Sequence, residues 1–356
     1  MVKKLNLNFK MDMRQIIYGL SILVMASCGS NAGKNSNSEA EAALEADTFV
    51  FSGNPLVRTK FTADPAPMVH DGRLYLYVGH DEFYEGQDSA SGGKEFNITE
   101  WLCYSTDDMK HWTDHGSVLK PTDYEWSAGA AWASQVVEKD GKFYYYTTSI
   151  GKDDYPGYCV GVAVSDSPTG PFKDAIGRPL VTDNMTDNGK RGWWNDIDPT
   201  VLIDGDDAWL CWGNGTCFLA KLKPNMVDLD GEIKVLDVPN YVEGPWLHKY
   251  NDKYYLTYAS LGAGRETISY CTAPSMDGPW TFGGELTGMA ENSFTIHPGI
   301  IEFNGQWYLF YHNAVLELDG HKGAIGRRSV CVDSLFYNET GDMIPVIQTS
   351  SYNKIE

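Results

Sequence analysis

One pattern of hydrophobic and polar positions recurs five times along the chain: an apolar stretch, a tight polar turn and an aromatic stretch. The copies are PMVHDGRLYLY (67–77), SQVVEKDGKFYYY (134–146), PTVLIDGDDAWLCW (199–212), PWLHKYNDKYYLTY (245–258) and PGIIEFNGQWYLFY (298–311). Their turns begin at Asp71, Asp140, Asp204, Asn251 and Asn304. The turn dipeptides DG, ND and NG suit type I′ turns, which need positive φ at both central residues. Each copy therefore predicts a β-hairpin.

A second segment follows three of these hairpins and reads YSTDDMKHW (104–112), VSDSPTGPF (164–172) and TAPSMDGPW (272–280). Each copy ends a strand, makes a turn and adds a bulky aromatic residue. Sheet-forming units repeated at long spacing, without convincing amphipathic helices, are typical of propellers. A β-sandwich has no such long-period motif. We therefore predict an all-β fold, a five-bladed β-propeller with four-stranded antiparallel blades around a central channel.

The first 47 residues have a different pattern from the rest. Residues 1–27 read as an export signal, with a basic start and an apolar run (16–26) too short to span a membrane. MASC resembles a bacterial lipobox, which would make Cys28 the lipidated first residue, and plain secretion is the alternative. Residues 28–47 are polar and predict a flexible tether before a propeller domain at 48–356. The expected location is the cell envelope of a didermic bacterium, periplasmic or at the outer-membrane surface, with membrane contact only through Cys28.

Charge and cysteine content narrow the range of partners. The leader holds four of the 28 basic and one of the 48 acidic residues, so the rest of the chain has 24 against 47 and a formal charge of −23. This acidity argues against nucleic acid or an anionic membrane surface and favours a neutral oligo- or polysaccharide. Six cysteines remain besides Cys28, without zinc-ligand spacing. We expect them to be buried free thiols, with a Cys211–Cys217 disulfide as the alternative.

One position immediately upstream of each inner hairpin is ionisable in four of the five repeats. In chain order this position holds Asp64 (ADPAP), Ala133 or Ser134 (WAS), Asp198 (IDPT), Glu243 (VEGP) and His297 (IHPG). Because the innermost strands of a propeller line its channel, equivalent positions on different blades should meet around one axis. A proline follows each ionisable residue within two positions, and we expect it to hold the preceding residue extended. The four residues are therefore predicted to form one site at a mouth of the channel.

Three carboxylates and a histidine around a polar axis suit the hydrolysis of a glycosidic bond. One carboxylic acid protonates the leaving oxygen, while one carboxylate activates a water molecule on the other face of the sugar. A third carboxylate near the acid would raise the pKa of the acid by like-charge repulsion. The competing interpretation, that each Asp-Pro is only a strand cap, does not explain four ionisable residues at one repeat position.

These motifs resemble glycoside hydrolase family 43. The resemblance rests on ADPAP, WAS, IDPT, EGPW and HPG, with YSTDDMKHWTDHG after the first hairpin, and runs from about residue 61 to residue 342. Members of that family are five-bladed propellers that hydrolyse α-L-arabinofuranosides or β-xylosides with inversion. Many relatives have WAPD or WAPE where this chain has WASQ (132–135). This departure leaves the three carboxylates intact and should alter the wall of the sugar pocket.

The resemblance implies a role for each of the four residues. Asp64 would be the general base, Glu243 the general acid and Asp198 the residue that modulates the pKa of the acid and positions the sugar. His297 would lie at the channel centre, where many relatives hold a calcium ion, usually through water, and a packed histidine is the alternative. A structural calcium ion is implied by resemblance alone, since the chain has no EF-hand-like loop. No cofactor is required for the reaction itself.

Further sugar contacts are also implied by the resemblance. GHDE (79–82) resembles a segment of the pocket rim, with His80 and Asp81 facing the sugar, and a solvated acidic loop is the alternative. Arg327 or Arg328 resembles the arginine that reaches the substrate from the last blade, and strand alternation turns one of the two inward.

Aromatic rings match the apolar C–H faces of sugars, so some of the eleven tryptophans are candidate platforms. Most tryptophans must pack between blades. The candidates are Trp132, Trp193, Trp194 and Trp246, with Trp126 and Phe83 as weaker ones.

We therefore predict an inverting glycosidase that removes terminal α-L-arabinofuranosyl or β-D-xylosyl residues from arabinan, arabinoxylan or arabinogalactan. An endo-acting xylanase or arabinanase would use the same carboxylates, but the insertions at 81–99 and 183–194 favour a closed pocket. A catalytically inactive glycan-binding lipoprotein should lack a carboxylate, and a kelch-type protein scaffold needs no acidic ring. All three carboxylates are present, which favours the enzyme.

Overall fold

The computed structural model describes residues 47–186 and 194–349. The predicted leader, lipidated Cys28, most of the tether and Trp193 lie outside the described residues, so these predictions stay predictions. In the described part of the chain, no helix is long and apolar enough to cross a membrane.

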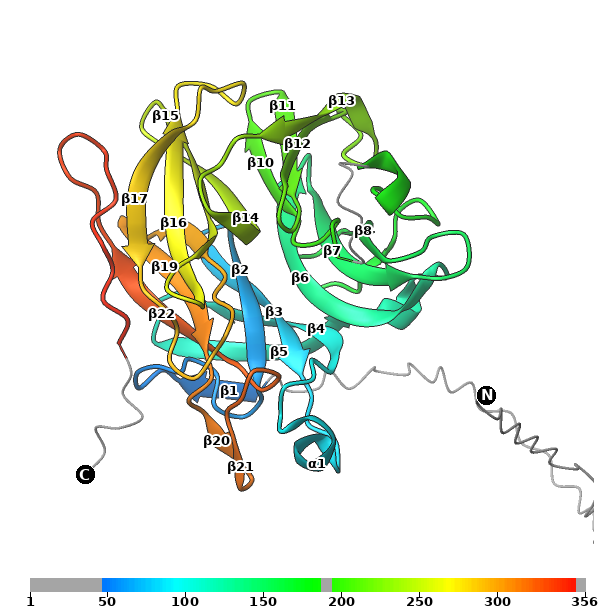
Figure 1. Ribbon diagram of the computed structural model, residues 1–356, viewed down its shortest axis with the longest axis vertical. Coiled ribbons are helices and arrows are strands. Elements are labelled where there is room, and N and C mark those ends of the chain that lie inside the picture. Colours follow the sequence, from blue (N-terminus) through cyan, green and yellow to red (C-terminus); the bar gives the residue numbers. More distant parts are fainter. Residues whose placement is uncertain (1–46, 187–193, 350–356) are drawn as a thin grey trace, which may run out of the picture. The chain divides into compact units, whose positions relative to one another are not determined.

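Five antiparallel sheets form the blades, and their innermost strands contact one another in a closed ring (Figure 1). The inner strands are β2 (Thr62–His70), β6 (Ser127–Lys139), β10 (Thr200–Asp204), β14 (Tyr241–Tyr250) and β18 (Gly299–Phe303). Each is the first strand of a predicted hairpin. The predicted all-β, five-bladed β-propeller is confirmed.

Blades 2, 3 and 4 have the predicted four strands. Blade 2 continues with β7 (Lys142–Gly151), β8 (Tyr158–Ser165) and β9 (Lys173–Asp174). Blade 3 continues with β11 (Asp207–Trp212), β12 (Cys217–Leu222) and β13 (Leu229–Leu236). Blade 4 continues with β15 (Lys253–Leu261), β16 (Glu266–Ala273) and β17 (Thr281–Thr287).

Blades 1 and 5 depart from four strands. Blade 1 contains β3 (Arg73–Asp81), β4 (Ile98–Thr106) and β5 (His111–Leu119), and β1 (Asp47–Val50) pairs with β5 as a fifth strand. Blade 5 has three strands, β18, β19 (Gln306–Asn313) and β22 (Ser329–Leu335). The segment after β1 runs beside β22, where the Leu56 N–H donates to the Val330 carbonyl at 2.7 Å. This contact joins the first blade to the last.

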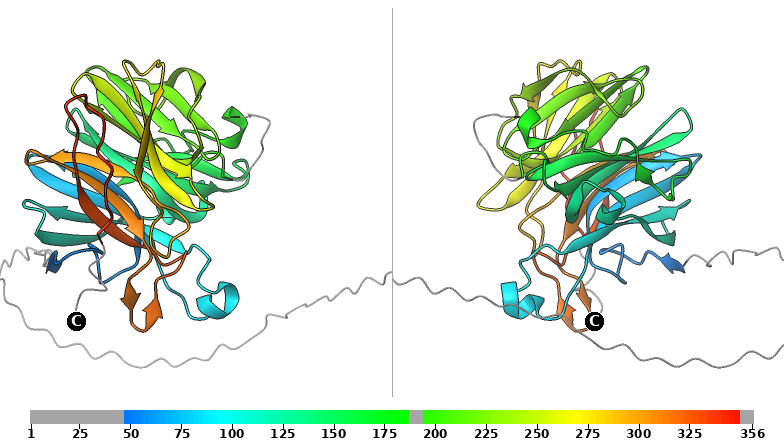
Figure 2. Two further views of the ribbon diagram at one scale, coloured as in Figure 1. Left: turned by 60° about the vertical axis from the view of Figure 1, so that its left-hand side comes forward. Right: turned by 90° about the vertical axis from the view of Figure 1, so that its right-hand side faces the viewer.

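The remaining elements are short: α1 (Gln87–Ser91), the 3₁₀ turns η1 (Pro121–Asp123) and η2 (Asp183–Met185), and a ribbon of β20 (Glu317–Leu318) and β21 (His321–Lys322). In both views of Figure 2, α1 and this ribbon project from the same end of the propeller. Arg327, which follows the ribbon, donates to Gln87 at 2.9 Å and to Asp88 at 2.7 Å, so the two projections are linked.

Three of the five inner hairpins have the predicted turn, because both loop residues have positive φ. The three loops are Asp71–Gly72, Asp140–Gly141 and Asn304–Gly305. The third hairpin turns one residue later than predicted, because Asp204 pairs with Asp207 and the loop is Gly205–Asp206. In the fourth, only Asn251 of the two loop residues has positive φ. The type I′ prediction was therefore wrong for these two turns, although both are still two-residue hairpins.

The hydrophobic core fills the spaces between blades and is rich in aromatic side chains. Its largest fully buried members include Trp101, Trp112 and Trp212. The six cysteines of the described domain are buried free thiols, as predicted. Cys211 and Cys217 have sulfur atoms 3.5 Å apart without a disulfide bond.

Candidate active site

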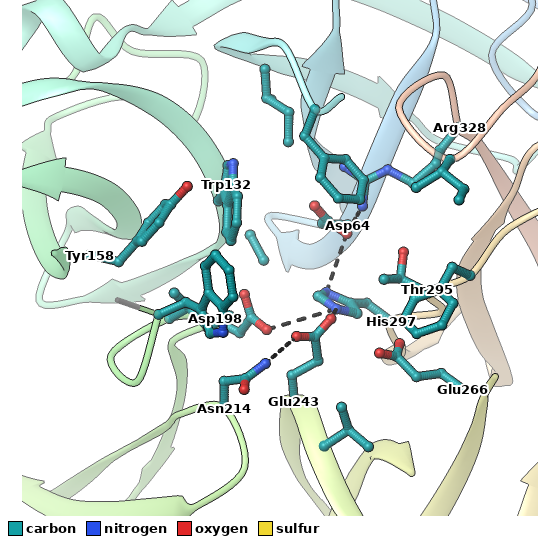
Figure 3. A pocket seen from close by; sticks show the side chains of 18 of the residues that line it. Asp64, Trp132, Tyr158, Asp198, Asn214, Glu243, Glu266, Thr295, His297 and Arg328 are labelled. Carbon is teal, nitrogen blue, oxygen red and sulfur yellow. Dashed lines mark hydrogen bonds and ion pairs between the residues drawn. The ribbon is translucent and has the colours of Figure 1, made fainter. Parts of the chain in front are cut away.

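The four ionisable residues predicted from the repeat meet at one end of the channel (Figure 3). His297 lies between the others. Its Nδ1 is 3.2 Å from Asp64 Oδ1, and its Nε2 is 3.1 Å from Glu243 Oε1 and 3.7 Å from Asp198 Oδ2. Residues more than 200 positions apart in the sequence thus surround a single imidazole ring.

Irregular backbone points these carboxylates into the channel. Asp64 and Asp198 have φ of 55° and 60°, so the prolines that follow them do not hold them extended, contrary to our expectation. Asp64 lies in a β-bulge of β2, and Glu243 lies in a bulge of β14 beside Gly244, which has φ of 57°. A bulge redirects a side chain and breaks local pairing, where a proline without an N–H does little harm. A Cβ at Gly244 would lie 2.9 Å from the His297 ring, so glycine is required there.

His297 carries a positive charge in this setting. Burial alone would lower its pKa, but the Asp64, Asp198 and Glu243 carboxylates outweigh burial and raise the pKa to about 10. Both ring nitrogens therefore carry a proton: Nε2 donates a hydrogen bond to Glu243, and Nδ1 forms an ion pair with Asp64.

The charge on His297 is shared unequally by the carboxyl groups. Burial would raise the pKa of Glu243, but the hydrogen bond and charge of His297, with a further hydrogen bond from Asn214, lower it. Burial raises the pKa of Asp198 and outweighs the charge of His297, which lowers it; His297 lies farther from Asp198 than from Glu243. Of these two carboxyl groups, Asp198 therefore holds a proton more readily than Glu243. We had expected the opposite effect on Glu243, a pKa raised by the neighbouring third carboxylate.

Arg328 is the arginine that faces the site. Its guanidinium donates to Asp64 Oδ1 at 2.9 Å and makes a two-point contact, at 2.9 Å each, with Asp81. Asp81 is fully buried behind Arg328, so it orients the arginine and does not face the sugar as expected. Arg327 does not line the cavity but contacts α1.

The four residues line the base of a cavity of about 570 Å³, whose walls are rich in aromatic side chains. Trp132, Tyr158, Phe96, Trp194 and Phe294 line it. The Trp132 and Tyr158 rings are 4.2 Å apart, and about half of the Trp194 side chain is exposed at the rim. Trp132 and Trp194 therefore occupy the positions expected of sugar platforms.

Several other candidates lie elsewhere. His80 pairs with Glu100 at 3.0 Å, outside the cavity. Trp246 lines the narrow channel behind the ionisable residues, and its indole donates to Ile300. Trp126 packs against Tyr124 in the core, and Phe83 stacks on His321.

Comparison with known proteins agrees with this geometry. Residues 52–341 match the family described as glycosyl hydrolases family 43. The chain belongs to this family. It is 31% identical over 335 residues to a xylosidase/arabinosidase of Bacteroides ovatus, covering 82% of this chain and 96% of the relative. It is 27% identical to an arabinoxylan arabinofuranohydrolase of Bacillus subtilis, covering 90% of this chain and 68% of the relative.

Solved structures of family 43 enzymes share the fold. A β-xylosidase/α-arabinofuranosidase from a compost metagenome, in a calcium-free complex with xylotriose, superposes with a TM-score of 0.71 and 27% identity over 84% of this chain and 98% of that chain. An α-L-arabinofuranosidase from Clostridium thermocellum has a TM-score of 0.66 and 34% identity, with 82% and 95% covered. This chain is thus a glycoside hydrolase.

Three polar residues of this family 43 site were missed by the sequence analysis. Asn214 donates to Glu243 Oε2 at 2.6 Å, and His312 accepts from the Asp64 backbone N–H at 3.3 Å. Glu266 adds a fourth carboxyl group to the cavity wall. Asn214 and Glu266 lie beyond the inner strands, outside the repeated position from which the other site residues were predicted. Polar residues at the ends of aromatic strands were the available signal.

The narrow channel behind the four ionisable residues does not fit the calcium ion implied by the resemblance. It measures about 20 Å³, room for about one water molecule. Calcium takes six to eight oxygen ligands. Among the described residues, the grouped metal-ligand candidates are Asp198, Glu243 and His297, and both His297 nitrogens already pair with carboxylates. We therefore derive no step through calcium.

Proposed function

We propose that this family 43 enzyme is an inverting, exo-acting glycosidase that removes terminal α-L-arabinofuranosyl or β-D-xylosyl residues from plant polysaccharides. The observation that carries the proposal is the placement of Asp64 and Glu243 on opposite nitrogens of His297, at the base of an aromatic-walled cavity.

The interposed imidazole supports inversion. Retaining glycosidases hold their two carboxyl groups about 5–5.5 Å apart, whereas inverting ones need about 6.5–9.5 Å to admit a water molecule. Asp64 forms an ion pair with His297 Nδ1, and Glu243 accepts a hydrogen bond from His297 Nε2. The imidazole ring and one polar contact on each side of it separate the two carboxyl groups, which favours the wider spacing.

The hydrogen bonds support a distinct role for each carboxyl group. Asp64, held by Arg328, is the proposed base that takes a proton from the attacking water. Glu243 is the proposed acid, and the proton it needs is one hydrogen bond away on His297 Nε2. Asp198 accepts from the Gly244 N–H at 3.0 Å, beside Glu243, and holds the next residue of β14 in place.

The walls support action on chain ends or side branches. Lys94, Phe96 and Ile98, from the insertion at 81–99, line one side of the cavity, and Trp194, at the end of the second insertion, lines another. An endo-acting enzyme needs an open cleft through which a polymer can pass. The names of the relatives, which include xylosidase/arabinosidase and arabinoxylan arabinofuranohydrolase, agree with terminal pentoses as substrates.

Hydrolysis of aryl α-L-arabinofuranoside and aryl β-D-xyloside, measured in parallel, tests the proposal. We expect the wild type to cleave at least one of these glycosides. NMR should show that the sugar is first released as the inverted anomer. Asp64→Ala should lose activity by roughly 10²–10⁴-fold, the usual contribution of a general base. Release of the retained anomer, or an unimpaired Asp64→Ala variant, would overturn the assignment.

A further inference from the structure

Glu266 is a carboxyl group in the cavity that none of the proposed steps uses. It begins β16, on the same blade as Glu243, and its side chain is 97% buried. It lines the cavity together with Phe294 and Thr295, and in Figure 3 this wall lies across from Trp132 and Tyr158. A buried carboxyl group is costly unless it has partners or a function.

The fold fixes only one of the two carboxyl oxygens. Oε2 accepts a hydrogen bond from the Ile296 N–H at 3.1 Å, and the Glu266 N–H donates to the Phe294 carbonyl at 3.3 Å. Within the described residues, Oε1 has no hydrogen-bond partner, and it is not among the buried, unsatisfied atoms sealed from solvent. Backbone contacts thus hold the group rigidly while leaving one oxygen available to the cavity.

The charges around Glu266 favour its neutral form. Burial and the neighbouring Glu243 carboxylate raise the pKa of Glu266 to about 9, against the opposing effect of His297. A neutral carboxyl group is a hydrogen-bond donor as well as an acceptor. No cation is paired directly with it in the described residues, unlike Asp64, which Arg328 contacts.

We propose that Glu266 is a substrate-binding residue whose free oxygen forms a hydrogen bond with one ring hydroxyl of the terminal sugar in the cavity. The inference rests on the proposed glycosidase function and adds a specificity-determining contact to it. Because Glu266 lies deep in the cavity, beside Glu243 and Thr295, the contact is to the sugar whose bond is cleaved. The group would select for a hydroxyl at one position and orientation on the pentose.

The test compares Glu266→Ala and Glu266→Gln with the wild type on the cleaved aryl glycoside and on analogues that each lack one ring hydroxyl. Glu266→Ala should lower kcat/KM by about tenfold, the effect of one hydrogen bond, mostly through KM. One deoxy analogue should abolish this difference between variant and wild type, because the partner hydroxyl is already missing. Glu266→Gln, which can accept from Ile296 and donate to the sugar, should stay within about threefold.

Two controls keep the test sharp. Glu285→Gln changes an exposed carboxylate on β17 of the same blade and should leave the kinetics unchanged. Thermal unfolding identifies loss of the Ile296 contact as a stability effect, and if Glu266→Ala does not fold, Glu266→Asp withdraws the carboxyl group by one carbon and takes its place.

The outcomes separate this inference from the proposed function. A loss in Glu266→Ala that is equal on every analogue, or no loss at all, would overturn the sugar contact while the glycosidase stands. A wild type that cleaves neither glycoside would overturn both.

Discussion

At the scale of single residues, we expect Glu243, the proposed acid, to be the most sensitive position. Both Glu243 oxygens accept hydrogen bonds, from His297 and Asn214. Glu243→Gln preserves the shape but has no proton to give the leaving oxygen. We expect kcat on a natural oligosaccharide to fall by roughly 10²–10⁴-fold and to fall much less on an aryl glycoside with an activated leaving group. Equal losses on both substrates, measured under the same conditions, would argue that Glu243 is not the acid.

A second residue-scale prediction concerns pH and stability. Burial raises the pKa of Asp196 to about 6, although Trp212 and Thr186 donate to its carboxyl group. The folded protein thus keeps a proton that the unfolded chain releases near pH 4, and the free energy of unfolding falls as pH rises from about 4 to 6. The loss is on the order of 2–3 kcal/mol.

Asp196→Asn should remove this loss. Thermal unfolding at pH 4 and pH 7 should show the variant gaining stability relative to the wild type at the higher pH, whereas Asp154→Asn, at an exposed position, should follow the wild type. An identical pH dependence in wild type and Asp196→Asn would contradict the inferred neutral form.

The sequence was informative about residues wherever the repeat placed them. Asp64, Asp198, Glu243 and His297 were predicted to meet because they share one position in four repeats, and they do. Glu266 has no counterpart in the repeat, and its position depends on contacts with residues 294–296 that no local pattern encodes. The division of protons between Asp198 and Glu243 depends on sub-ångström differences in distance from His297 and was equally unpredictable.

At the scale of elements, we predict the effect of replacing Gly244 in the bulge of β14, with a glycine in a hairpin turn as the control. Gly244 and Gly141 both have positive φ, but a Cβ at Gly141 meets nothing within 4 Å. Alanine at either position should cost about 1–2 kcal/mol of stability through backbone strain. Only Gly244→Ala should also displace the His297 ring and lower kcat, by roughly 10²-fold.

Urea denaturation and kinetics on both variants provide the measurement. Full activity in Gly244→Ala would mean that His297 tolerates displacement, and reduced activity in Gly141→Ala would mean that turn strain reaches the site.

Hairpins were predictable because their signal is local, while the outer strands were not. The dipeptides at Asp71, Asp140 and Asn304 set turns within a few residues of themselves. Blade 5 lacks a fourth strand. The fifth strand of blade 1 forms because β1 pairs with β5, which is distant from it in the sequence. Asn54 likewise contacts β22, nearly 280 residues away. A repeat alignment that treats every blade alike cannot anticipate how the ring closes.

At the scale of the whole molecule, closure places Asp64 and Arg328 in contact, since one belongs to the first blade and the other to the last. The same junction carries the Thr62 N–H, which donates to the Arg328 carbonyl at 2.9 Å, and a buried cluster that includes Leu56, Leu76 and Val330. The same junction between the first and last blades therefore affects both the stability of the propeller and the position of Asp64, the proposed base.

Asn54 tests the strength of this junction. Its side chain accepts from the Val332 N–H at 2.9 Å and donates to the Val332 carbonyl at 3.0 Å, at a buried position. Asn54→Ala leaves both backbone groups without these partners, and the free energy of unfolding should fall by about 2–4 kcal/mol. The exposed Asn225→Ala should cost under about 1 kcal/mol. Urea titration followed by tryptophan fluorescence measures both changes, and equal losses would show that the apolar cluster alone holds the first and last blades together.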